Sequence, residues 1–303
     1  MRTELCGILP AVASPCDEND RFLEDVFAEH LASLYRARIR GVYVCGSTGD
    51  GKRMRLDDRK RAAQIAVEVS KEFGGKVLLH VGAETTRDAV ELSEHGAEAG
   101  VDIVSSLVPN NCSHSDILSY YTDIAKASSL PILAYHIPIL SSRVATFEEV
   151  LSVLDIEHVM GIKISQWDLF FLQRVRWARP DLVIFSGYDE FLCPGLLYGA
   201  DGGIGMWYNM WPDLYVGIYE AVQRREVEKA MELQSLLNAF VEFAWEYGIN
   251  ECFEYTLQRR GVDAHFFRRP RSPWSDELLR KIGPEIDARM QAIDQALQVL
   301  AVE

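Results

Sequence analysis

A lysine inside an apolar, β-branched run is the residue of this 303-residue chain that most directly suggests chemistry. Lys163 lies in VMGIKIS, with apolar residues on both sides. If this run is a strand of a packed parallel sheet, burial disfavours the ammonium form and frees the amine to attack a carbonyl carbon. The alternative is a lysine that reaches water at the rim of the sheet or pairs with a carboxylate. The residues alone leave both interpretations open.

Polar side chains also stand in or just after other apolar runs. Tyr135, in LAYHIP, is a phenol that could relay protons while an imine forms and breaks down, although such a tyrosine taken alone is more often part of a core. Ser47 and Thr48 belong to the small-residue turn GSTG, whose amides and hydroxyls could hold a carboxylate. In isolation, such a turn is usually only a turn. Asp189 and Glu190 close a later run.

The elements that would bring these residues together repeat along the first two thirds of the chain. Segments of helical apolar spacing alternate with short apolar runs of strand length, which are residues 7–15, 41–48, 76–83, 102–109, 131–138, 159–165, 182–190 and 202–207. This alternation predicts an α/β fold, a closed parallel (β/α)8 TIM barrel rather than an open doubly wound sheet, although periodicity does not prove closure. No G-x-G-x-x-G follows the first run, which disfavours dinucleotide binding. Active sites of such barrels lie at the carboxyl ends of the strands, where the candidates above stand.

The chain changes character near residue 225. Beyond it the strand signals stop, and helices are predicted over residues 226–248, 250–261 and 275–303. Pro284 interrupts the third of these near its start. We therefore predict a barrel domain over residues 1–225 and a C-terminal helical region over residues 226–303.

The composition excludes several classes of protein. Lys and Arg total 31 against 45 for Asp and Glu, a formal charge of −14, which argues against a protein that binds duplex nucleic acid. The hydrophobic fraction of 48% excludes a disordered chain. No stretch approaches the roughly 20 apolar residues of a membrane span, and the first residues lack the apolar core of a signal peptide. We expect a cytoplasmic protein with neither a membrane nor a nucleic-acid partner.

Metal and redox sites are not expected either. The six cysteines form no C-x-x-C pair, which fits free thiols in a reducing compartment. His80 and His136 lie in predicted strands, but no carboxylate or second histidine stands at ligand spacing beside either one. We therefore expect both to be ordinary histidines of the core or the rim.

Five motifs, taken together and in order, resemble a known family. They stand at the expected strand ends and are GSTGD (46–50), YHIP (135–138), GIKIS (161–165), GYDE (187–190) and GADGGIG (199–205). In this combination the chain resembles the pyruvate-dependent lyase superfamily of N-acetylneuraminate lyase and dihydrodipicolinate synthase. The resemblance spans nearly the whole chain, including the helical tail.

This resemblance implies a homotetrameric class I aldolase that needs no metal or cofactor. Lys163 would form a Schiff base with the keto carbon of pyruvate or a 2-keto-3-deoxy sugar acid, and Tyr135 would relay protons. Ser47 and Thr48 would bind the carboxylate of the 2-oxo acid, and Thr48 would also be a catalytic residue. The resemblance also implies substrate contacts at Ser165, Gly187, Asp189, Glu190, Gly205 and Met206. The iminium would permit carbon–carbon cleavage or formation, or loss of a β-hydroxyl as in dehydratase members.

Two positions separate the branches of the superfamily. Dihydrodipicolinate synthases usually carry an arginine five residues after the tyrosine, where this chain has Leu140. They also carry a Tyr-Tyr pair after the proline that ends the fourth strand, where this chain has Asn110 and Asn111. Both departures count against lysine biosynthesis, and the motifs GSTGD, YHIP and GYDE are nearer to the N-acetylneuraminate lyase branch.

The match to that branch has departures of its own. Met206 stands where a small hydroxyl residue is usual, so a hydrogen bond to the substrate tail would be lost and volume filled. Lys52 and Arg53 place two cations near the expected mouth of the barrel. These changes suggest a substrate that is smaller or more acidic than sialic acid, such as a short 2-keto-3-deoxy sugar acid. The alternative is that both cations only pair with surface carboxylates.

Two other functions stay open at this point. GADGG at 199–203 could bind phosphate, which would give a Schiff-base aldolase of phosphorylated sugars, although Asp189 and Glu190 would repel the phosphate. A barrel without activity could also serve as a binding module. Retention of the lysine, the tyrosine and the Ser-Thr turn speaks against this last possibility.

Overall fold

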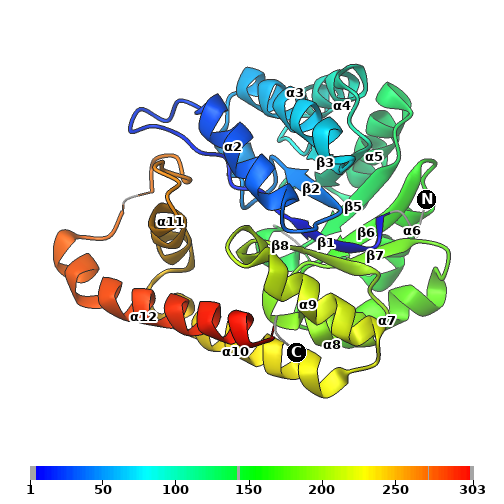
Figure 1. Cartoon of the computed structure of the whole chain (residues 1–303). Helices are drawn as coiled ribbons and strands as arrows, with labels where there is room; N and C mark the ends of the chain where they lie inside the picture. The colour runs from blue at the N-terminus through cyan, green and yellow to red at the C-terminus, as the bar shows by residue number, and fades with distance from the viewer. Residues whose placement is uncertain (1–4, 142–143, 272, 301–303) are drawn as a thin grey trace.

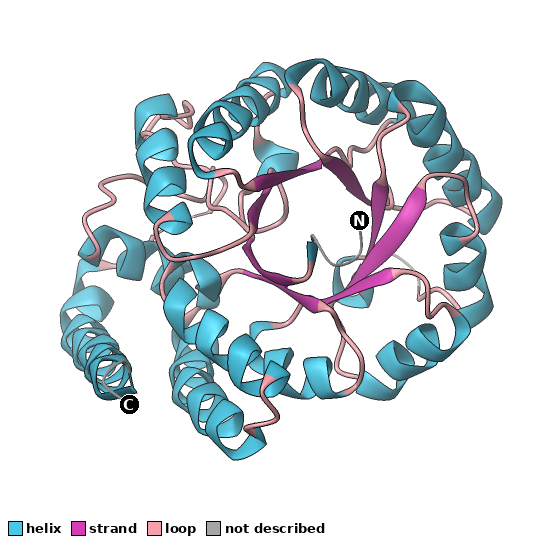
Figure 2. Ribbon diagram, turned by 45° about the vertical axis from the view of Figure 1, so that its right-hand side comes forward, coloured by secondary structure: helices cyan, strands magenta, loops and turns pink. Residues whose placement is uncertain are grey.

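A ring of parallel strands forms the centre of the molecule. The computed structural model describes residues 5–141, 144–271 and 273–300, and in them one eight-stranded sheet has the order β1-β8-β7-β6-β5-β4-β3-β2. A parallel bridge between Ala11 and Tyr43 joins the two edges, because Val12 N donates to Tyr43 O at 2.8 Å. Figure 2 shows the ring with helices all around it. The predicted TIM barrel is therefore confirmed.

Each predicted run contains one strand. The strands are β1 (Gly7–Pro10), β2 (Gly41–Val44), β3 (Lys76–His80), β4 (Ile103–Leu107), β5 (Ile132–His136), β6 (Val159–Ile164), β7 (Val183–Ser186) and β8 (Gly202–Gly205). The runs extend past the strands at their carboxyl ends, since the residues there form the turns around the mouth of the barrel. Four of these turns are short 3-10 helices, η1 (Gly51–Arg53), η2 (Pro138–Leu140), η3 (Asp189–Phe191) and η4 (Trp207–Asn209).

The helices of the barrel cover the outer side of the strands. They are α2 (Glu24–Tyr35), α3 (Leu56–Phe73), α4 (Thr86–Ala99), α5 (His114–Ser128), α6 (Phe147–Leu154), α7 (Leu169–Ala178), α8 (Leu192–Leu197) and α9 (Pro212–Gln223). Side-chain caps begin four of them: Thr85, Ser113, Thr146 and Asp168 each accept a hydrogen bond from a backbone N–H in the first turn. Such caps fix where a helix starts and hence how long the preceding loop is.

Asn209 ties the last strand to the first. Its Nδ2 donates to Ala11 O at 2.8 Å and to Met206 O at 2.7 Å, and its Oδ1 accepts from Ala13 N at 3.3 Å. The Oδ1 atom also lies 2.9 Å from Nε2 of the buried His30 on α2. This buried amide therefore fixes the turn after β8, including Met206.

Three helices follow the barrel: α10 (Val227–Tyr247), α11 (Ile249–Arg259) and α12 (Asp276–Leu300). Figure 1 shows α10 and α12 along one side of the molecule. The predicted interruption at Pro284 is wrong, because α12 runs through this residue without a break. Proline removes one backbone donor, and burial of Ile282 and Ile286 on the same helix offsets that cost.

The loop between α11 and α12 returns to the mouth of the barrel. Cys16 N donates to His265 O at 2.7 Å, and Arg268 N donates to Asp50 Oδ2 at 2.9 Å. These contacts tie the C-terminal region to the loops after β1 and β2, so the division at residue 225 stays a prediction. None of the helices in the described part of the chain combines the length and the apolar character needed to cross a membrane.

Candidate active site

Lys163 points into the barrel. In the sheet it is in register with Tyr135 of β5 and Phe185 of β7, and Phe185 belongs to the apolar cluster inside the ring. The two sequence neighbours of Lys163 belong instead to the core between strands and helices. The lysine is 5% exposed, and its Nζ lies 4.4 Å from the ring centroid of Tyr135 and 5.0 Å from that of Tyr43. Among the described residues no carboxylate forms an ion pair with it. The interpretations of a rim lysine and of a paired lysine therefore do not apply.

Tyr43 is a site residue that the sequence analysis missed. Its ring meets that of Tyr135 edge-on at 6.4 Å, and its hydroxyl lies 3.0 Å from Ser105 Oγ. Burial raises the pKa of Tyr43 far above its ordinary value, so it stays a neutral phenol. The available signal was the alternation along GVYV, because a strand that turns Val42 and Val44 toward the helices must turn Tyr43 inward.

Gly187 makes room for the lysine. A Cβ atom at this position would lie 1.9 Å from Ser165 Oγ and 3.0 Å from Lys163 Cε. Ser165 is 1% exposed, and its hydroxyl finds no hydrogen-bond partner among the described residues. Buried hydroxyls are nearly always hydrogen-bonded, so an unpaired one beside the amine marks a place for a polar group that binds there. The structure thus brings together three of the predicted residues, Lys163, Ser165 and Gly187.

Asp189 organises the turn after β8. Its Oδ1 accepts from Trp207 N at 2.7 Å and its Oδ2 from Met206 N at 3.1 Å. Gly205 permits this approach, since a Cβ there would lie 2.5 Å from Asp189 Oδ1. Burial, and then the charge of Glu190, raise the pKa of Asp189 to about 7. Both oxygens of Asp189 are therefore engaged by backbone amides.

Glu190 is more open than its neighbour. It is half-buried, and its Oε1 accepts a hydrogen bond from Trp245 Nε1 at 3.2 Å. Asn238 Nδ2 donates to the backbone oxygen of Glu190 at 3.3 Å. Both partners come from α10, so the C-terminal region helps to orient this acidic residue at the mouth.

Ser47 and Thr48 lie in the turn after β2, as predicted from the chain order. Ser47 is exposed and Thr48 is half-buried. Ser47 lines a cavity of about 370 Å³ whose other lining residues include His80, Asn110, Leu140 and three cations, Lys52, Arg53 and Arg271. This cavity lies at the carboxyl ends of β2, β3, β4 and β5, on the side of the mouth away from Glu190.

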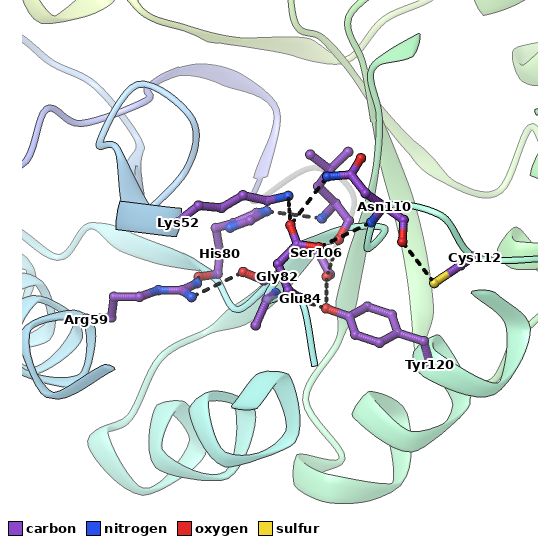
Figure 3. A network of polar contacts seen from close by, with 11 residues as sticks. Lys52, Arg59, His80, Gly82, Glu84, Ser106, Asn110, Cys112 and Tyr120 are labelled. Carbon is purple, nitrogen blue, oxygen red and sulfur yellow. Dashed lines mark hydrogen bonds and ion pairs between the residues drawn. The ribbon is translucent and has the colours of Figure 1, made fainter. Parts of the chain in front are cut away.

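Two of the three cations of this cavity form ion pairs. Lys52 Nζ lies 2.8 Å from Glu84 Oε1, and Arg53 Nη1 lies 2.6 Å from Asp50 Oδ1. Asn110 Nδ2 donates to the same Glu84 oxygen at 3.4 Å (Figure 3). The alternative of pairing with surface carboxylates matches the structure for Lys52, since Glu84 is 57% exposed, whereas Arg53 pairs with the buried Asp50.

The two histidines are engaged by hydrogen bonds. Leu107 N donates to His80 Nε2 at 3.1 Å, and burial together with the charge of Arg59 lowers the pKa of His80 well below its ordinary value. His136 Nε2 lies 3.2 Å from Gln166 Oε1. In the residues that the structure describes, no group of three or more His, Cys, Asp or Glu side chains could hold a metal ion.

The glycine-rich segment considered for phosphate lies elsewhere. Residues 199–201 precede β8, at its amino end, and Asp201 there pairs with Arg176. A Cβ on Gly202 would lie 2.1 Å from Gly7 O, so this glycine allows β8 to pack closely on β1. Sites of these barrels form at the carboxyl ends, and residues 199–203 therefore do not form a phosphate site at the mouth.

Comparison with known proteins gives a consistent picture. The profile of the dihydrodipicolinate synthetase family matches residues 4–289. N-acetylneuraminate lyase of Citrobacter koseri is 33% identical over 310 aligned positions, covering 97% of this chain and 99% of the relative. N-acetylneuraminate lyase of Rhizobium meliloti is 31% identical over 271 residues, covering 88% and 89%. The crystal structure of N-acetylneuraminate lyase from Fusobacterium nucleatum complexed with pyruvate has a TM-score of 0.86 at 26% identity, and the match covers 97% of each chain.

Proposed function

The chain belongs to the dihydrodipicolinate synthetase family and is a lyase, and on this premise we propose that Lys163 forms a Schiff base with the keto carbon of a 2-oxo acid. The observation that carries the proposal is the environment of this amine. It is buried inside the barrel, lies against two phenol rings and has no carboxylate partner among the described residues. An amine held in this way, without a carboxylate partner, is placed to attack a carbonyl carbon that enters the barrel.

The proposed reaction is a carbon–carbon cleavage. The Lys163 amine adds to the keto carbon, and loss of water leaves an iminium. The iminium accepts the electron pair of the bond between the third and fourth carbons, and the hydroxyl on the fourth carbon loses its proton and becomes the oxygen of the departing aldehyde. Tyr135, whose ring lies 4.4 Å from Nζ, relays this proton to the third carbon. Water then releases pyruvate and the free amine, and the same steps in reverse form the bond.

The other predicted residues receive roles from their positions. Ser47 and Thr48, in the turn after β2, hold the carboxylate of the 2-oxo acid, and Thr48 joins the proton relay. Ser165 and Gly187 border the amine, and the unpaired hydroxyl of Ser165 supports a polar contact there. Beyond them, hydroxyl groups of the substrate bind Glu190, while Asp189, Gly205 and Met206 shape the wall behind it.

The substrate in this proposal is N-acetylneuraminate or a shorter 2-keto-3-deoxy sugar acid. The curated relatives are named for the first of these compounds, whereas Met206 leaves less room and no hydroxyl at the turn after β8. We further propose that the protein is cytoplasmic and forms a homotetramer, as the resemblance implies. Sedimentation velocity would test the tetramer.

Trapping with borohydride tests the proposal. The full chain is incubated with pyruvate and borohydride, and its mass is then measured. We expect an increase of one reduced pyruvate on Lys163 and none in Lys163→Ala. A wild-type protein without the adduct, or an adduct that persists in Lys163→Ala, would remove the proposed chemistry. Turnover of sialic acid and of a panel of 2-keto-3-deoxy acids then identifies the substrate.

A further inference from the structure

Two indole rings stand half exposed at the mouth of the barrel, beside Glu190. Trp167 is 54% exposed and Trp245 is 52% exposed, and their ring centroids lie 6.4 Å apart. Tyr188 lies against Trp167 with a centroid distance of 4.7 Å and an angle of 34° between the planes. We call Trp167, Tyr188 and Trp245 the aromatic shelf. Large exposed apolar surfaces next to a candidate site usually serve binding.

The loop that carries Trp167 is held in place. Gln166 Oε1 lies 3.2 Å from His136 Nε2, and its Nε2 donates to Asp168 O at 3.4 Å. Asp168 Oδ1 in turn accepts from Phe171 N at 3.1 Å and caps α7. Residues on both sides of Trp167 are thus anchored, so the exposed indole is a built feature of the loop.

The aromatic shelf is continuous with the proposed catalytic centre. Trp167 follows β6, which carries Lys163, and Tyr188 follows Gly187 at the end of β7. Burial raises the pKa of Tyr188, and Tyr135 and Glu190 add to this rise because both lie near it. A substrate attached to Lys163 and extended past Glu190 therefore meets the aromatic shelf with its far end.

The shelf combines apolar faces with a carboxylate at their edge. Trp245 Nε1 donates to Glu190 Oε1 at 3.2 Å, so the second oxygen of that carboxylate can accept from a ligand. Aromatic faces bind the flat or apolar face of a ring, and a carboxylate accepts from hydroxyl groups at the ring's edge. A short linear chain would leave both indoles uncovered.

We propose that the aldehyde half of the substrate carries a ring, aromatic or pyranose, which stacks on the aromatic shelf while its hydroxyl groups bind Glu190. This inference rests on the proposed Schiff-base chemistry, and it replaces the linear aldehyde halves of the sugar acids named above with ring-bearing ones. In the direction of bond formation, the enamine of pyruvate on Lys163 adds to the aldehyde carbon, and the aldehyde oxygen takes up a proton. The ring takes no part in the bonding change.

Rates of aldol addition test the inference. Pyruvate is combined with three aldehydes: 3-hydroxybenzaldehyde, maltose as an aldose that bears a second sugar ring, and the ringless glyceraldehyde. The quantity compared is the ratio of kcat/KM for each ring-bearing aldehyde to kcat/KM for glyceraldehyde. We expect Trp167→Ala to lower this ratio about ten-fold for whichever ring is preferred, and Trp167→Phe to retain most of it. The two ring-bearing arms separate an aromatic from a pyranose ring.

Trp177→Ala is the matched control. This residue is a 65% exposed indole on α7, paired with Phe170 rather than with the aromatic shelf, and its removal should leave the ratio unchanged. An unchanged ratio in Trp167→Ala overturns the inference. So does an equal loss of all three rates together with a changed oligomeric state in sedimentation, because Trp167 would then serve assembly and not ring binding. If the wild type forms no borohydride adduct with pyruvate, the proposed function and the inference both fail. An adduct without a ring preference removes only the inference.

Discussion

The two sides of the barrel mouth are built in opposite ways. On the side of β6, β7 and β8, the acidic side, buried residues pack against glycines: Gly187 leaves room for Lys163, and Gly205 leaves room for Asp189. On the side of β2 to β5, the cationic side, Lys52 and Arg53 form ion pairs around an open cavity. Close packing fixes positions to within tenths of an ångström, whereas exposed ion pairs are weak and replaceable. The first side therefore holds the amine in a fixed position, whereas the two cations of the second side, unlike Tyr135, Ser47 and Thr48 there, are not tied to the reacting centre.

Replacing Gly187 should produce the largest effect. In Gly187→Ala the new Cβ would meet Ser165 Oγ at 1.9 Å and Lys163 Cε at 3.0 Å, so the amine must move. A displacement of this size costs about 100-fold in kcat. We expect that loss in steady-state kinetics, together with slower trapping of pyruvate by borohydride.

Gly217→Ala is the control for a glycine that no site residue approaches. This glycine lies on α9, where a Cβ would meet only Leu233 Cδ1 at 3.4 Å, and helical alanine is favoured over glycine. Activity should be unchanged. Near-normal trapping by Gly187→Ala would show that the acidic side is less tightly packed than its distances indicate.

The sequence was sufficient for the parts of the molecule that follow repeating patterns. Alternating runs and helical segments predicted the barrel, and the rule on carboxyl ends placed Lys163, Tyr135 and the GSTG turn at one mouth. Pro284 was misjudged because packing of distant apolar residues overrides a local helix breaker. Tyr43 and the aromatic shelf were missed because they involve contacts between residues that are far apart in the sequence, up to about 120 positions for Tyr43 and Lys163. Periodicity describes only neighbouring residues and cannot predict such contacts.

A smaller effect is expected on the pH dependence of the free energy of unfolding, through the buried carboxyl of Asp189. Its pKa is about 7 in the folded protein, raised from 3.8 by burial and by Glu190, so the folded state holds a proton that the unfolded state releases between these values. The stability that this proton contributes is complete below pH 4 and is lost as pH rises through 7. Between pH 5 and 8 the wild type should lose about 2 kcal/mol more free energy of unfolding than Asp189→Asn, measured by urea titration. Equal losses in the two proteins would mean that Asp189 is ionised throughout.

The smallest effect is expected on the cationic side. Lys52→Ala/Arg53→Ala removes two cations that Glu84 and Asp50 already neutralise, and the Lys52 pair is 36% and 57% exposed, so salt and water screen it. KM for a substrate with a second acidic group should rise less than about three-fold.

Glu84→Gln gives the reciprocal test of the same pair. It releases Lys52 toward the cavity without removing any cation, so KM for the same acidic substrate should fall about two-fold at low salt and return at high salt. If the double variant instead raises KM ten-fold or more, the cations bind substrate despite their partners. Lys52 and Arg53 would then belong to the substrate site together with Ser47 and Thr48, and the substrate would carry a second anionic group.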